Sequence, residues 1–245
     1  MAYALADDLK GMLGWLRISP GNQAIFQQVS LEEHLDREKA RIDAQASVLG
    51  YTLPVTPTVP PTAQDLLLEL LNLEQPTANL LIAAAGAGPA EMQQYYRGIR
   101  LRAAYWWGLY ERGFFNDVFD SSLAPLPTTG LVDYSDVSEV VAGLAIGASA
   151  IPSQAVIDRI GQRYSIPVYS LLRFRGLRLT GYTTPQAQLV KRAAMDWTVA
   201  TVVRARGISQ TMPALFNSLA YELDQVAIDS FNRLLRGDYD LVLEA

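Results

Sequence analysis

The stretch PAEMQQYYRGIRLRAAYWWGLYERGFF, residues 89–115, predicts the longest helix of the chain. Apolar and aromatic side chains recur in it at intervals of three and four residues: Tyr95, Ile99, Ala103, Trp106 and Tyr110. This spacing is the period of an α-helix with one buried face. Three basic side chains lie off that stripe: Arg97, Arg100 and Arg102.

Trp106 and Trp107 are adjacent in this helix. Neighbouring residues of a helix point about 100° apart, so we expect the helix to be covered on two sides. One interpretation buries the helix centrally in its own domain. The other packs one side against another subunit, where Trp and Tyr are favoured anchors. Trp106 and Trp107 are therefore candidate interface aromatics.

Helical patterns also occupy most of the rest of the chain, which predicts an all-α protein. One segment differs. In YSLLRFRGLRLTGY, residues 169–182, apolar residues alternate with Arg173, Arg175 and Arg178 at a period near two on each side of Gly176. This alternation predicts a small two-stranded β-ribbon or an extended loop. The preceding helical pattern is expected to end at Pro167, and another to break at Pro76, because proline disfavours a helix interior.

The uncharged, Pro-rich stretch SSLAPLPTTG, residues 121–130, predicts a linker between two domains, 1–120 and 131–245. The pentads YTLPV, 51–55, and YSIPV, 164–168, occur in similar order within each half. They predict two similar helical modules from a tandem repeat.

Composition excludes several classes of function. The chain of 245 residues contains no Cys and one His. Half of its residues are apolar, and its net charge is −5. There is thus no thiolate metal site, no multi-His site and no Cys nucleophile. The apolar runs are far shorter than the roughly 20 residues that span a bilayer. With no signal-peptide pattern at the N-terminus, we expect a protein that folds in a cytoplasm.

No enzyme signature is present either: no GxGxxG, no GxxxxGK[ST] and no GxSxG. His34 lies in the charged run that contains Glu32, Glu33 and Asp36. A solvated, ion-paired helix face explains this run better than a metal or acid–base site. We therefore expect no catalytic residue, no metal and no cofactor.

Short motifs in the two halves point to a family. The first half opens with the motif from Tyr3 to Leu9, and 134–140 is its weaker counterpart in the second half. The pairs Ile42-Asp43 and Ile157-Asp158 and the two pentads follow in each half, and the chain has an ending motif from Gly237 to Leu241. With these motifs the chain resembles the head–tail adaptor, or connector, proteins of tailed bacteriophages. It departs from them in length, because the family usually has one such module per chain.

The resemblance implies a helical wedge, copies of which form a ring, commonly dodecameric, between the portal protein and the tail or tail-terminator protein. Genomic DNA would pass through the channel with weak, non-specific contact. The location implied is the neck of the virion, after assembly in the host cytoplasm, and no catalysis or membrane is implied.

Two segments are candidates for contacts in such an assembly. From Arg159 to Arg206 there are nine Lys or Arg and a single acid, Asp196. Arg173, Arg175 and Arg178 are candidates for contact with the lumen DNA or with a neighbouring subunit; a solvated face is the alternative. In the tail, the apolar Leu241, Val242 and Leu243 are candidates for docking on the portal. A clip on the chain's own domain is the alternative.

A second hypothesis is another viral structural role, such as a capsid, nucleocapsid or tail-proximal subunit without catalytic activity. A nucleocapsid protein would bind nucleic acid in a salt-dependent way.

Overall fold

The structure is a computed structural model that describes residues 2–13, 28–54, 58–85, 90–147, 152–207 and 213–243. It confirms the all-α class, because the described residues form helices and connecting segments without a strand. The helices are α1 (Ala6–Leu13), α2 (Gln28–Leu49), α3 (Ala63–Ala85), α4 (Ala90–Glu111), α5 (Asn116–Phe119), α6 (Tyr134–Val140), α7 (Gln154–Phe174), α8 (Thr184–Gly207), α9 (Pro213–Arg236) and α10 (Asp240–Leu243).

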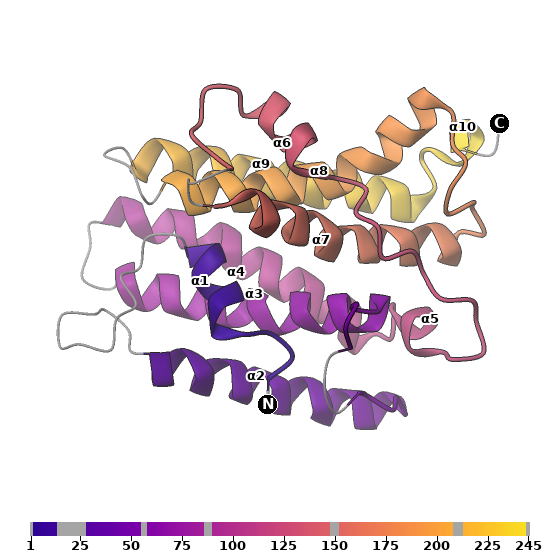
Figure 1. The fold of residues 1–245 in the computed structure, drawn as a ribbon, viewed down its shortest axis with the longest axis horizontal. Helices are drawn as coiled ribbons and strands as arrows, with labels where there is room; N and C mark the ends of the chain where they lie inside the picture. Colours follow the sequence, from indigo (N-terminus) through magenta and orange to yellow (C-terminus); the bar gives the residue numbers. More distant parts are fainter. Residues whose placement is uncertain are drawn as a thin grey trace.

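The long helices pack in layers (Figure 1). Helix α2 lies at one edge next to α3, and the antiparallel pair α8 and α9 lies at the other, with α4 and α7 between. Helix α4 contacts both α3 and α9, which agrees with a helix covered on two sides. None of the described helices combines the length and apolar character needed to cross a membrane.

An aromatic cluster holds the layers together. The ring centroid of Trp106 in α4 lies 5.1 Å from that of Trp197 in α8 and 5.4 Å from that of Phe231 in α9. Tyr164 of α7 stacks on Trp197 at 6.0 Å. Each of these side chains is almost completely buried. Burial of a large aromatic ring stabilises a fold by roughly 1.5–3 kcal/mol, so this cluster is a main source of stability.

Two helices continue through prolines where the sequence predicted a break. Pro76 lies inside α3 and Pro167 lies inside α7. A proline in a helix interior costs about 3 kcal/mol. In α7 the flanking Ile166 and Val168 are fully buried, so tertiary packing outweighs this cost. In α3 the Thr77 hydroxyl donates to the Leu73 carbonyl at 2.6 Å, next to the proline.

The predicted ribbon is wrong for residues 169–174, which form the last turns of α7. The helix ends where Gly176 adopts a φ of 70° and the Leu177 N–H donates to the Leu172 carbonyl at 2.9 Å. A glycine in the left-handed region after a helix is a common terminator. The loop alternative applies only to 177–183, where the described chain is neither helix nor strand.

The two pentads differ in local structure. Described residues 51–54 form neither helix nor strand after α2, and Val55 lies outside the described residues, whereas 164–168 is inside α7. Residues 121–130 contain no helix, as expected of the linker. One hydrophobic core nevertheless takes side chains from both sides of it. A second, smaller core cluster, which includes Leu9, Leu31 and Leu80, belongs to the first half alone. The division into two similar modules stays a prediction.

Candidate functional site

The three candidate arginines near the end of α7 do not share one surface. The Arg173 Nη2 donates to the Ala124 carbonyl at 2.6 Å, and its Nη1 lies 3.8 Å from the Asp117 Oδ2. Arg173 is therefore held against its own chain. Arg175 is the C-cap residue of α7. Arg178 is exposed in the following loop and is the member of the three best placed for a contact outside the chain.

The candidate interface aromatics lie mainly inside the molecule. Trp106 is 0% exposed, so it is a core residue and not an anchor for a neighbouring subunit. Trp107 is partly buried, and the Arg41 guanidinium lies over its ring at 3.5 Å from the centroid. The structure thus supports the interpretation in which the helix is buried centrally in its own chain.

The C-terminal tail is also attached to its own chain. Leu243 is 1% exposed within the core, and the Gln186 amide donates to the Val242 carbonyl at 2.7 Å. The side chain of Leu241 lies outside the described residues. Val242 is the exposed apolar residue of the tail in the described structure, so docking on a portal stays a prediction for that side chain.

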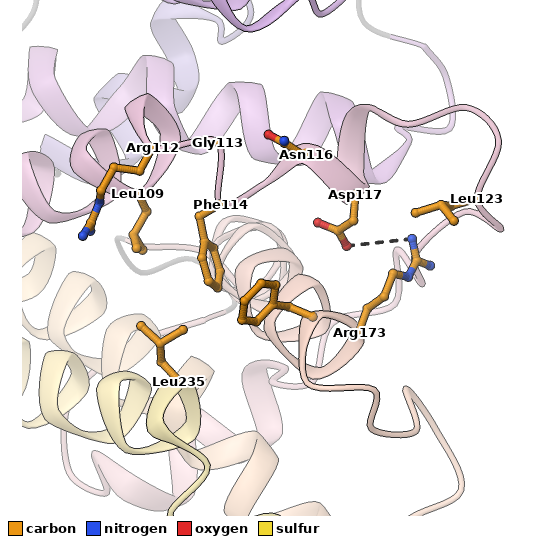
Figure 2. A pocket seen from close by; sticks show the side chains of 10 residues that line it. Leu109, Arg112, Gly113, Phe114, Asn116, Asp117, Leu123, Arg173 and Leu235 are labelled. Atoms are coloured by element: carbon orange, nitrogen blue, oxygen red, sulfur yellow. Dashed lines mark ion pairs between the residues drawn. The ribbon is translucent and has the colours of Figure 1, made fainter.

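The candidate site is a groove of about 550 Å³ between the end of α4, the segment with α5, the end of α7 and the end of α9 (Figure 2). Its apolar lining consists of Leu109, Phe114, Leu123, Phe174 and Leu235. Its other lining residues are Arg112, Gly113, Asn116, Asp117 and Arg173. Phe174 is 64% exposed, an unusual degree for a phenylalanine. An apolar concavity of this kind is typical of a binding site.

The end of α4 creates this groove. Gly113 adopts a φ of 69° and its N–H donates to the Tyr110 carbonyl at 2.9 Å, which terminates the helix. The chain then turns so that Phe115 enters the core. The ring centroids of Phe114 and Phe174 lie 5.4 Å apart. The Gly-Phe-Phe sequence directly after a helical pattern could have indicated this turn, but not the partners that α7 and α9 supply.

Charges lie at both ends of the groove. Figure 2 shows Arg112 on one side of Phe114 and the Asp117–Arg173 ion pair on the other. The Arg112 Nε donates to the Gly108 carbonyl at 2.8 Å. The Arg112 side chain is exposed. Because Asp117 offsets Arg173, Arg112 leaves the groove with a positive charge.

Asp117 is a partly buried carboxylate of the groove. The Ser170 hydroxyl donates to its Oδ1 at 2.5 Å, and its Oδ2 is buried without a hydrogen bond from a described residue. Burial raises the pKa of Asp117, although Ser170 and Arg173 act in the opposite direction. By contrast, hydrogen bonds from Ser122 lower the pKa of the exposed Asp120.

We predict that the two aspartates titrate on opposite sides of their ordinary pKa of 3.8. Because folding raises the pKa of Asp117, its protonation favours the folded state. That contribution is fully present below the unfolded pKa and is lost as the pH rises through the folded pKa. A carbon-detected NMR titration of side-chain carboxyls measures both midpoints. A midpoint for Asp117 at or below that of Asp120 would contradict this assignment.

A second cluster of charged residues is completely buried where α3, α4, α7, α8 and α9 meet. The Arg102 Nε donates to Glu74 at 2.8 Å, and its Nη1 donates to Thr201 at 2.9 Å and to Asp224 at 3.2 Å. The Tyr164 hydroxyl donates to Glu74 at 2.5 Å, and Arg204 pairs with Asp224. We call these six residues the buried network.

The charges in the buried network balance: two arginines face two carboxylates. Burial alone would lower the pKa of Arg102, but Glu74, Tyr164 and Asp224 hold it above its ordinary value. Burial also raises the pKa of Tyr164, which stays neutral. The six residues come from α3, α4, α7, α8 and α9, so the buried network joins these five helices. The Arg102 Nη2 and the Arg204 Nη1 are buried without a hydrogen-bond partner among the described residues.

This network was not predicted, because Arg102 was grouped with the basic residues outside the aromatic stripe. Arg102 precedes Trp106 by one helical turn, and both lie buried on the same face of α4. Among the described residues there is no group of three His, Asp or Glu side chains arranged to hold a metal ion.

The charged run around His34 lies in α2, where the sequence predicts ion pairs. In this run Arg37 pairs with Glu33 at 3.5 Å.

Comparison of the chain with protein-family models, with curated proteins and with solved structures found no match.

Proposed function

We propose that this chain is a structural subunit of the head–tail connector of a tailed bacteriophage. Copies would form a ring in the neck of the virion, between the portal and the tail, around the channel through which DNA passes. Two features support this proposal: the short motifs that resemble connector proteins, and the all-α fold that such a resemblance implies.

The observation that carries the assembly part of the proposal is the exposed apolar groove. Phe174 and Leu123, which line it, expose 64% and 43% of their surface. A clustered apolar surface next to a concavity is characteristic of a protein–protein contact. In a ring, each subunit would cover the groove of its neighbour.

Two further exposed side chains are candidates for contacts in the ring. Arg178 would face DNA or an adjacent subunit, since it is the exposed arginine of the three. Val242 would contribute to portal docking. Leu243 anchors the tail in the core, and Val242 beside it is exposed. Val242 could therefore contact the portal while the tail stays attached to its own chain.

The proposal predicts that Phe174→Glu weakens self-association. Transfer of a phenylalanine from water into an interface contributes roughly 1.5–3 kcal/mol, and a carboxylate there adds a desolvation cost. The dissociation constant should rise by more than about tenfold. Mass photometry and sedimentation velocity of the full chain measure the change.

Val48→Glu is the matched control, because Val48 is 79% exposed on α2 and does not line the groove. It should assemble like the wild type. Equal assembly of the Phe174→Glu variant and the wild type would reject the groove as an assembly surface.

A further inference from the structure

The outer face of α9 carries a second surface with apolar and acidic side chains. Leu219, Glu222, Val226 and Asp229 follow one another at intervals of three and four residues, so they lie on one face of the helix. Leu219 and Val226 expose 44% and 41% of their surface, and Glu222 and Asp229 are exposed. We call these four residues the α9 face.

The two acids of the α9 face have no ion-pair partner among the described residues. The nearby pairs of α9 involve other carboxylates: Asp224 with Arg102 and Arg204, and Asp238 with Arg233 and Arg236. The α9 face therefore presents two negative charges beside two apolar side chains to whatever packs on it.

The α9 face and the groove are complementary in chemistry. The groove offers an apolar lining with the positive charge of Arg112 at one end. A helix that lays apolar side chains into a groove is a recurrent mode of recognition, in which anchors one or two turns apart face the groove. Opposite charges at the rim of such a contact fix its register and exclude other partners.

One chain cannot make this contact with itself. The groove is bordered by Leu235 near the end of α9, whereas the α9 face is centred on residues 219–229. Six to sixteen residues of helix separate them, which is about 9–24 Å at 1.5 Å per residue. The end of α9 borders the groove, and the same rigid helix carries the α9 face, so the partner of each surface must be another molecule.

We infer that the α9 face of one copy occupies the groove of the next copy, with Glu222 and Asp229 beside Arg112. This inference rests on the proposed function, since it names the partner of the groove in the ring. Two different surfaces of the same chain form a head-to-tail contact, and such a contact generates a closed ring when the rotation between copies closes.

The test is a charge exchange in the full-length chain. Arg112→Glu alone, and Glu222→Arg with Asp229→Arg, should each raise the dissociation constant for self-association by about tenfold or more. The variant that combines all three substitutions should return to within about threefold of the wild type. Raising the salt concentration should weaken the wild-type and combined assemblies alike. Sedimentation velocity measures each constant, and circular dichroism confirms that each variant is folded.

Arg37→Glu is the matched control: it makes the same change of charge on α2, where Arg37 is exposed and lies outside both surfaces. It should leave self-association unchanged. If Phe174→Glu disrupts assembly but the combined variant is no better than the separate ones, another occupant fills the groove; this inference falls and the proposed function stands. A wild-type chain that is monomeric at every concentration would overturn both.

Discussion

Asp224→Asn is expected to lower the free energy of unfolding by about 3–5 kcal/mol, because it removes the carboxylate that two buried arginines share. Arg102 and Arg204 both pair with Asp224, and all three side chains are at most 4% exposed. Asparagine keeps the size of the side chain but not its charge. It would leave the buried network with two guanidinium groups and the single carboxylate of Glu74.

Urea unfolding at neutral pH, followed by circular dichroism, measures this loss. Asp7→Asn is the matched control: Asp7 pairs with Lys10 at 2.8 Å, but its side chain is 85% exposed. Exposed pairs contribute roughly 0–1 kcal/mol, so this control should be nearly neutral. A loss for Asp224→Asn as small as that of the control would mean that the buried network does not hold charged groups in the way described above.

Separate expression of the halves, 1–125 and 126–245, is expected to produce two chains that do not fold alone. Division of the chain separates Glu69 from Arg159 and Arg163, and Arg102 from Asp224. It also exposes the faces of Trp106 and Trp197 that pack against each other. Since a domain is stable by only about 5–15 kcal/mol, these losses exceed what either half can tolerate.

Far-ultraviolet circular dichroism and amide exchange of each half test this expectation. The uncut chain is the control and should unfold in one cooperative transition. Co-expression of the halves should restore the helical signal, because the shared core can then assemble from two chains. Two halves that each fold with native-like protection would support the independent modules that the Pro-rich linker suggests.

The bounds of α8 and α9 agree with local signals in the sequence. The α8 pattern is bounded by Thr184-Pro185 and Gly207, and the α9 pattern by Pro213 and Gly237; both helices form between those signals. Their apolar spacing and their terminal residues agree with each other, which is the condition under which local signals are reliable.

The failures have a common physical cause, which is tertiary burial. Proline is a local signal for a helix end, but Pro167 is enclosed by buried neighbours, so α7 continues. The alternation around Arg173 resembles a strand, but Leu171 and Leu172 need the helical conformation to reach the core. In each case the energy that decides the structure comes from residues distant in the sequence.

The groove was not predicted from the sequence. Arg173 and the end of α7 border it, but its apolar lining comes from four separate parts of the chain. Leu109, Phe114, Leu123 and Leu235 carry no shared motif, and only the fold brings them together. Leu243 and Trp106 were candidates for outside contacts because they are apolar, and the fold buries both.

The central claim is that this chain is a ring subunit. Electron microscopy of the purified full-length protein, over a range of concentrations up to those at which particles assemble, tests it most directly. We predict closed rings with a central channel, in which neighbouring copies meet at the groove beside Phe174. Particles that stay monomeric throughout, or that associate through other surfaces into open aggregates without a channel, would contradict the account.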